Sequence, residues 1–495
     1  MSTIRPQAAR AALLLAGAAW SLFLYGRAPT DVFYTGDAGL KSLLIGQLAR
    51  GELAPQLALQ APPWLASLWS QGFYPFGPPF VYDTPAAHTV SFPIYFAALC
   101  SPLYALAGLR GALLVPLFAL WGVWLQVYRL CRLRAFTDWQ TNAALATVIL
   151  ASPLTFYGAL LWEHTLGVLL FSFGLEALCR RVGAERVAGW HMALLGALAG
   201  SAVTMRPESY VPLAFLALAM ALAGAPARRN LPFFLGLGAV VSAVWMSNIA
   251  LYGKPLGLHG TQVLEPSEQM SFAHHLLERA SSMGRKLLFT TPATALALYA
   301  VVRLARDRFV ALAGALLLSS LLAIPLVVPN DGIRQIGPRY LLLLIPLIAL
   351  IAAHALPDAR WYRVAFACTV LLGVRFDVVR ASRELLRDYD QARIPALTWL
   401  QQAPQSVIVV ERQETAHELA SLFASKHVLR ADDGPQLAAL SDRLRAEGRP
   451  SFVLVRFARD PSKIADVLTT PAGRTVIARE SRTIGAFAMR AMSVR

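Results

Sequence analysis

Apolar runs dominate the chain, and they predict a bundle of membrane-spanning helices. The first run, between Arg10 and Arg27, carries no charge and with its flanks can cross hydrocarbon of about 30 Å. Similar runs follow at approximately 89–108, 110–128, 141–161, 165–179, 188–205, 210–225, 231–252, 287–302, 309–328, 340–356 and 361–379. No small-residue cleavage pattern follows the first run, so we interpret it as a retained helix and not as a signal peptide.

The distribution of arginine decides how many of these runs span. If every run crossed from a cytoplasmic N-terminus, several arginine-rich loops would lie outside, against the positive-inside rule. If the run 89–108 stays in the outer interface, all these loops become cytoplasmic. They carry Arg129, Arg132 and Arg134; Arg180, Arg181 and Arg186; Arg228 and Arg229; Arg303, Arg306 and Arg308; and Arg360 and Arg363. We therefore predict about eleven spans and an outer first loop over 27–109.

The first loop has its own pattern. Residues 73–82 mix aromatic side chains with prolines, which suits an irregular interfacial segment. Residues 40–53 alternate apolar and polar positions at helical spacing, which predicts an amphipathic helix along the membrane surface. The alternative is a lid without membrane contact.

After Arg380 the apolar runs give way to a different pattern. Residues 406–410 and 451–455 are typical of buried strands, and helical patterns lie around 417–423 and 436–445. The sequence thus predicts an all-α polytopic membrane domain over 1–380 and a small α/β domain over 381–495. With an odd number of spans, the C-terminal domain lies on the extracytoplasmic side.

Composition excludes other classes of protein. Of 495 residues, 56% are hydrophobic and only 15% charged, more apolar surface than a water-soluble domain can bury. The net charge of +16 is scattered between apolar runs and forms no basic stripe, so nucleic acid is not an expected partner. The four cysteines show no CxxC or Cys/His spacing, which indicates neither disulfides nor zinc.

Ionisable residues at the outer ends of the predicted helices are the candidates for chemistry, because membrane proteins rarely keep such groups without use. They are Asp37, Lys41, Asp83 and His88 in the first loop, Glu163, His164, Arg206 and Glu208 between later spans, and Asp331, Arg334, Arg339 and Tyr340 before a late span. They are distant in sequence but share one predicted membrane face.

Four segments that contain these candidates resemble segments of the GT-C glycosyltransferases. They are 36–41 (Gly-Asp-Ala-Gly-Leu-Lys), 162–164 (Trp-Glu-His), 206–208 (Arg-Pro-Glu) and 337–341 (Gly-Pro-Arg-Tyr-Leu). These membrane enzymes take sugars from polyprenyl-phosphate donors, and the resemblance covers most of 1–380. It implies Asp37 as general base, and Arg339 with Lys41 or Arg206 as ligands of the lipid phosphate. His164, Glu208 and Tyr340 complete the candidate substrate-binding set.

The chain departs from this family in one respect. Many members carry two acids in the first loop, whereas Asp37 stands alone here. Asp83 and Glu163 are therefore candidates for the second catalytic carboxylate, and a divalent metal is an open candidate cofactor.

The residue types fit this chemistry, although structural alternatives exist. Inverting transfer needs a carboxylate to take the acceptor proton and positive charge at the leaving phosphate. Arginine supplies a permanent charge and a planar fork of donors. Alternatively, Asp37 caps a helix, Arg206 and Glu208 form a simple ion pair, His164 is an interfacial histidine, and Arg339 with Tyr340 marks the interface.

These features predict an inverting glycosyltransferase of a bacterial-type inner membrane, with a cytoplasmic N-terminus. It would move a sugar from a polyprenyl-phosphate donor to an envelope glycan or lipid acceptor on the outer face, in contact with membrane lipids. A transporter or flippase of a lipid-linked saccharide is the alternative, but it would be expected to show two related halves with interrupted helices. A non-catalytic scaffold would explain the C-terminal domain but not the outer carboxylates and arginines.

Overall fold

The computed structural model divides the chain into two compact units. It describes residues 4–83, 88–223, 227–258, 260, 272–328, 330–331, 336–356, 360–459, 464–465 and 467–495. The helical unit comprises Met1–Ala28 and Leu113–Ser382, and the mixed unit comprises Pro29–Ala112 and Arg383–Arg495. The first loop thus groups with the C-terminal region and not with the helices. The predicted domains, 1–380 and 381–495, stay a prediction.

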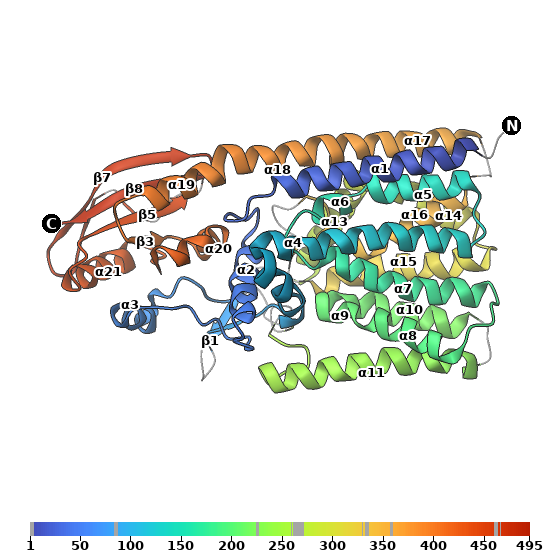
Figure 1. Cartoon of the computed structure of the whole chain (residues 1–495), viewed down its shortest axis with the longest axis horizontal. Helices are drawn as coiled ribbons and strands as arrows, with labels where there is room; N and C mark the ends of the chain where they lie inside the picture. The colour runs from blue at the N-terminus through green and yellow to red at the C-terminus, as the bar shows by residue number, and fades with distance from the viewer. Residues whose placement is uncertain are drawn as a thin grey trace. The chain divides into compact units, whose positions relative to one another are not determined.

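The helical unit is a bundle whose helices pack side by side (Figure 1). It contains α1 (Ile4–Arg27), the second half of α4 (Ile94–Leu133), α5 (Asp138–Leu150), α6 (Leu154–Tyr157), α7 (His164–Val182), α8 (Gly189–Gly200), α9 (Ala202–Met205), η2 (Pro207–Ser209), α10 (Tyr210–Leu222), α11 (Ala227–Tyr252), α13 (Phe272–Thr290), α14 (Ala293–Arg303), α15 (Arg308–Val327), η3 (Arg339–Leu344), α16 (Ile345–His354), α17 (Arg360–Gly373) and η4 (Val374–Ala381). Every residue of α16 from Ile345 to Ala353 is buried, so this helix forms the core of the bundle.

The helices coincide with the predicted apolar runs, but many are broken into shorter pieces. Among the described residues, four helices are long and apolar enough to cross a membrane: Pro6–Arg27, Ile94–Leu133, Arg228–Tyr252 and Arg308–Val327. Helix α4 leaves helical geometry at Ala107 and Gly108, close to where the predicted outer loop ends. The coarse class, a mostly helical membrane protein with a small C-terminal sheet domain, is confirmed. The number of spans, about eleven, stays a prediction.

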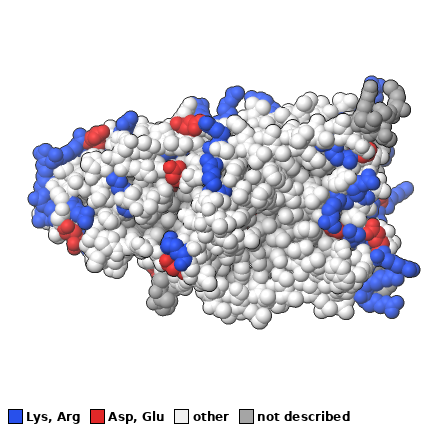
Figure 2. All heavy atoms as spheres, viewed as in Figure 1, with Lys and Arg blue, Asp and Glu red and all other residues white. Residues whose placement is uncertain are grey.

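The predicted arginine-rich loops lie at one end of this bundle. Arg10 on α1 pairs with Asp138 on α5, and Arg181 on α7 donates to the carbonyl of Arg229 on α11. The guanidinium of Arg134, after α4, lies 4.4 Å from the ring centroid of a phenylalanine at the start of α15. In Figure 2, Lys and Arg gather at this end, whereas the sides of the bundle carry little charge. This asymmetry is the one on which the predicted topology depends.

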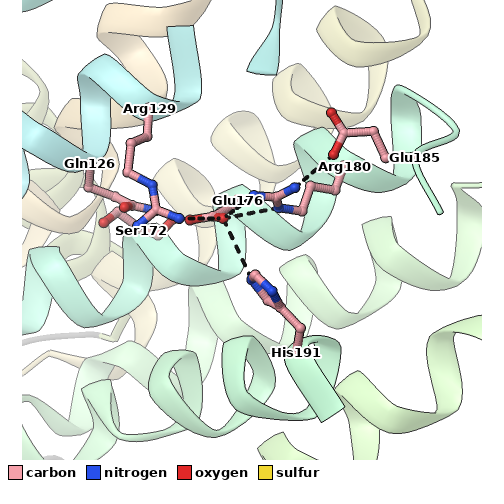
Figure 3. Close-up of polar contacts among 7 residues, drawn as sticks. All are labelled: Gln126, Arg129, Ser172, Glu176, Arg180, Glu185 and His191. Atoms are coloured by element: carbon pink, nitrogen blue, oxygen red, sulfur yellow. Dashed lines mark hydrogen bonds and ion pairs between the residues drawn. The ribbon is translucent and has the colours of Figure 1, made fainter. Parts of the chain in front are cut away.

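Glu176 connects three helices at the arginine-rich end (Figure 3). Its side chain is fully buried, and its Oε1 lies 3.0 Å from Arg129 Nη2 on α4 and 2.8 Å from Arg180 Nη2 on its own helix, α7. Gln126 Nε2 donates to Oε2 at 2.7 Å, and His191 on α8 lies 3.9 Å away. A buried carboxylate is tolerated when partners of this kind compensate its charge, so this cluster ties α4, α7 and α8 together.

The mixed unit is built on a six-stranded sheet with the order β4-β3-β5-β8-β7-β6. Strand β3 is parallel to β4 and β5, and the remaining pairs are antiparallel. The elements are α2 (Gly36–Ala49), α3 (Pro63–Leu68), η1 (Trp69–Phe73), β1 (Val81–Asp83), β2 (His88–Val90), α18 (Ser382–Asp388), η5 (Tyr389–Arg393), α19 (Ile394–Gln402), β3 (Val407–Val410), α20 (Gln413–Glu418), η6 (Ala420–Ala424), β4 (His427–Arg430), α21 (Gly434–Ala446), β5 (Ser451–Phe457), β6 (Val467–Thr469), β7 (Thr475–Ile484) and β8 (Phe487–Val494). The two predicted strands and the helix predicted around 436–445 are confirmed. The stretch predicted as helical around 417–423 is divided between the end of α20 at Glu418 and the short 3-10 helix η6.

Helix α2 differs from the predicted surface helix over 40–53. It begins at Gly36, ends at Ala49 and is buried on most of its sides, including Lys41, which is 3% exposed. One side packs directly on α20: a Cβ on Gly39 would lie 1.7 Å from the carbonyl oxygen of His417. Only glycine permits such an approach, so tertiary packing has made this helix an interior one.

Candidate functional site

The nine predicted site residues form two sets, one in each unit. The helical unit holds Glu163, His164, Arg206, Glu208, Arg339 and Tyr340, and the mixed unit holds Asp37, Lys41 and Asp83.

Arg206 is the centre of the set in the helical unit. Its Nη1 donates to Glu163 Oε1 at 3.0 Å, and its Nε donates to Glu208 Oε1 at 2.7 Å. All three side chains are only about 5% exposed. The local backbone explains the geometry: the residue before a proline avoids helical angles, and Arg206 is extended before Pro207, between α9 and η2. Glu163 stands immediately before α7.

Tyr340 lies against two arginines in the same unit. The guanidinium of Arg206 is 5.4 Å from the ring centroid of Tyr340, and that of Arg339 is 4.7 Å from it. Arg339 Nη2 also donates to the Tyr340 hydroxyl at 2.7 Å, and this hydroxyl lies 3.3 Å from Asn330 Oδ1. The ring face attracts both cations. The predicted pairing of Arg339 with Tyr340 is therefore present, but inside the unit, because Tyr340 is 1% exposed.

His164 belongs to an aromatic stack beside this cluster. Its ring lies 4.9 Å from those of Tyr157 and Trp162, at interplanar angles below 30°. It is buried at the start of α7, next in sequence to Glu163. The aromatic stack fixes the start of α7 and, with it, the Glu163 carboxylate.

The arginine cluster keeps one donor available. The two carboxylates, Glu163 and Glu208, and the two guanidinium groups, Arg206 and Arg339, balance in formal charge. Within the part of the chain that the structure describes, however, Arg206 Nη2 is buried and has no hydrogen-bond partner. Buried guanidinium donors normally find an acceptor, and phosphate oxygens accept from arginine with favourable charge and geometry. This donor suits an anionic ligand.

Asp37 occupies the first turn of α2 in the mixed unit. The N-cap position belongs to Thr35 and not to Asp37, which differs from the capping alternative considered above. A carboxylate in the first turn is stabilised by the helix dipole. Asp37 is 9% exposed, and Lys41, four residues on, shares its helix face. Lys41 Nζ lies 4.7 Å from the ring centroid of Phe92.

His417 is a residue of this region that the sequence reasoning missed. It lies on α20, is fully buried, and has its ring 5.0 Å from Phe76 and 4.9 Å from Phe80. Burial lowers the pKa of His417 to about 3, with Asp37 acting in the opposite direction and Arg430 in the same direction. The imidazole is therefore uncharged at neutral pH. A single histidine in a helical pattern carries no signal of this kind, so the sequence could not reveal it.

Asp83 has the environment of a surface acid. It ends β1, its side chain is 85% exposed, and its Oδ1 lies 2.6 Å from Nδ1 of His88 across the β1–β2 hairpin. The His88 ring in turn stacks on Tyr74 at 3.6 Å. This placement contrasts with the buried carboxylate of Asp37.

The donor sets do not fit a divalent metal. The carboxylates of Glu163 and Glu208 already accept from Arg206. In the described part of the chain, no group of three His, Cys, Asp or Glu side chains gathers as a metal site would need.

Comparisons with known proteins identify the fold of the chain. No protein-family model matches the sequence, and no curated protein matches it. Solved structures do match. ArnT from Cupriavidus metallidurans, both in the apo state and bound to undecaprenyl phosphate, is 12% identical with a TM-score of 0.55, covering 97% of each chain. The oligosaccharyltransferase of Archaeoglobus fulgidus, in complex with Zn and sulfate, is 13% identical with a TM-score of 0.54, covering 89% of this chain and 67% of that one. The chain therefore has the GT-C fold that its sequence motifs predict.

Proposed function

We propose that this protein is an integral membrane glycosyltransferase that moves a sugar from a polyprenyl-phosphate donor to an envelope glycan or lipid acceptor on the outer face. The observation that carries the proposal is the buried Arg206 guanidinium, held by two carboxylates and keeping one donor available. It lies in a chain with the GT-C fold, and a protein of that fold was crystallised with undecaprenyl phosphate.

The arginines stabilise the leaving group. As the bond between sugar and phosphate breaks, negative charge accumulates on the polyprenyl phosphate. Arg206 Nη2 and the Arg339 guanidinium supply positive charge there, and donors fixed in advance need no reorganisation during the reaction. Glu163 and Glu208 hold the Arg206 fork in place, so we assign Glu163 to positioning and not to proton transfer.

Asp37 is the general base. The acceptor hydroxyl oxygen attacks the anomeric carbon, the bond to the phosphate oxygen breaks, and the hydroxyl proton passes to the Asp37 carboxylate. Attack from the side opposite the leaving phosphate inverts the anomeric configuration. Lys41, one helical turn further on, is the cation we assign to substrate binding beside the base.

The donor class is tested with purified protein in proteoliposomes. Radiolabelled sugar on polyprenyl phosphate should be transferred to an envelope lipid extract, with release of polyprenyl phosphate that depends on the protein. The same sugars on nucleotide carriers serve as the matched control and should not react. If the intact lipid-linked sugar instead crosses the bilayer without cleavage, the protein is a flippase and not a glycosyltransferase.

The membrane orientation is tested with single cysteines in a background lacking the four native ones. Ala188, before α8, lies at the arginine-rich end, and Lys254 follows the opposite end of α11; both are exposed. We place the arginine-rich end in the cytoplasm. In intact spheroplasts, Lys254→Cys should react with an impermeant maleimide, and Ala188→Cys should react only after permeabilisation. The reverse labelling would invert the proposed topology and remove the outer-face site.

A further inference from the structure

Helix α13 carries a row of polar side chains along one side. The row consists of Arg279, Ser282 and Lys286, which are three and four residues apart and therefore lie on the same side of the helix. All three are partly buried, whereas the neighbouring Arg285 is exposed. Partly buried polar groups normally find hydrogen-bond partners. The row finds them in the connection between α15 and η3, the segment that leads to Arg339.

Asp331 in this connection is held by two residues of the row. Ser282 donates to its Oδ2, and Lys286 Nζ donates to the same oxygen at 2.8 Å and to the Asp331 carbonyl at 3.1 Å. Burial raises the pKa of Asp331, but the hydrogen bonds from Lys286 and Ser282 outweigh burial and hold the pKa below its usual range, so the carboxylate is ionised at neutral pH. Arg279 also donates to the carbonyl of Val328, where the connection begins.

Asn330, the residue before Asp331, contacts the candidate site. The Tyr340 hydroxyl donates to Asn330 Oδ1 at 3.3 Å and accepts from Arg339 Nη2 at 2.7 Å. A hydroxyl has one proton to donate and lone pairs that accept. Because its proton points to Asn330, a lone pair is left to face the Arg339 guanidinium. The place of Asn330 therefore influences how Tyr340 holds this arginine.

The far end of the connection is fixed as well. Tyr157, a member of the aromatic stack, donates to the carbonyl of Ile336 at 3.0 Å. Gly337 has a φ of +78°, and a Cβ there would lie 2.9 Å from Pro153 and 3.3 Å from Thr290, at the end of α13. Between α15 and η3, the described residues 328, 330–331 and 336–338 belong to no helix or strand. Without a regular ladder of backbone bonds, side-chain contacts decide where they lie.

We propose that Lys286 and Asp331 are positioning residues: their ion pair fixes Asn330 against α13 and, through Tyr340, orients the Arg339 guanidinium toward the leaving phosphate. The inference deepens the proposed function and rests on it. It assigns Asp331, a candidate for chemistry by its type and predicted depth, to holding an arginine in place. It also gives α13 a part in the use of the donor.

The test removes the ammonium group and keeps the rest of the side chain. In Lys286→Met, kcat/KM for the polyprenyl-phosphate donor should fall about 10- to 100-fold, since displacement of a catalytic group by about 1 Å can cost 10²-fold. KM for the acceptor should not change, which separates a positioning role from a general loss of structure. The measurement is the initial rate against the concentration of each substrate, with thermal unfolding in detergent as the check on folding.

Arg285→Met is the matched control, because it makes the same type of change on the exposed side of the same helix. It should transfer sugar at the parental rate. Parental kcat/KM in Lys286→Met, or an equal loss in Arg285→Met, would overturn the proposal. If Lys286→Met does not fold, Asp331→Asn decides instead: it keeps the shape of the side chain and weakens the same pair, and parental use of the donor by this variant would overturn the proposal.

A double-mutant cycle with Arg339→Lys tests the route of the effect. If Lys286 acts through Arg339, adding Lys286→Met to Arg339→Lys should cause little further loss. A full additional loss would show that Lys286 acts independently of Arg339 and would overturn the proposal. The proposed function fails in a different way, namely absence of transfer by the parental protein, which needs no variant.

Discussion

Asp37→Asn is expected to lower the rate of sugar transfer about 10²–10⁴-fold, the range for loss of a general base. Asparagine keeps the size of the side chain but has no basic oxygen to take the acceptor proton. Stability should change little, because asparagine keeps the shape of the side chain and the N-cap of α2 is Thr35, while the lost interaction with the helix dipole costs about 0.3–1 kcal/mol. The measurement is the single-turnover rate with radiolabelled donor, alongside thermal unfolding in detergent.

Asp83→Asn is the matched control for this prediction. It makes the same chemical change at another first-loop acid, one that is exposed and paired with His88, and it should transfer sugar within about twofold of the parent, as surface substitutions usually do. If Asp37→Asn reacts at the parental rate, the base lies elsewhere, with Asp83 and Glu163 as the next candidates. If no substitution among the three lowers transfer while lipid-linked saccharide still crosses the membrane, the flippase is correct.

Arg206→Gln is expected to destabilise the protein by about 3–5 kcal/mol, the usual cost of removing one partner of a buried ion pair. The two carboxylates that Arg206 holds would remain buried with no cation between them. Arg206→Lys keeps the charge but cannot donate in two directions from one planar group. It should therefore fold better than Arg206→Gln while still raising KM for the polyprenyl-phosphate donor.

Glu163→Gln is the control for charge. It removes one carboxylate but leaves Arg206 paired with Glu208, so the buried guanidinium keeps a partner of opposite charge and the loss of stability should be clearly smaller than in Arg206→Gln. Equilibrium unfolding of the variants in mixed detergent micelles gives the comparison. Equal losses of stability would mean that packing and not charge compensation holds this cluster together. The two carboxylates would then not depend on Arg206 for their burial.

The fold was predictable because its determinants are local. A bilayer requires long apolar helices, and buried parallel strands are continuous apolar runs, as in β3 and β5. The arginine asymmetry also predicted which loops meet at one end. The helix over 40–53 was predicted at the membrane surface, whereas α2 is buried. Its apolar pattern shows that one side is covered but not by what, and the structure shows that α20 packs against it.

The candidate residues were predictable by type, whereas their partners were not. Arg206 and Glu163 are 43 residues apart, and only the packing of α9 against α7 brings them together. No pattern in the sequence distinguishes a carboxylate that compensates an arginine from one that transfers a proton. The exposure of Asp83 and the burial of Asp37 are likewise properties of the folded chain.

By itself, the sequence determined the class of this protein: a mostly helical membrane protein with a small C-terminal sheet domain, and with acids and arginines in segments that resemble those of GT-C enzymes. These features depend on composition and local periodicity, which can be determined from short stretches of sequence. Tertiary structure alone decided that Arg206 holds two carboxylates and keeps one donor available, and that His417 packs against the first turn of α2. The physical reason is that such contacts join segments that are distant along the chain, from 43 residues for Glu163 and Arg206 to 336 residues for Gly77 and Gln413, and no local pattern encodes them.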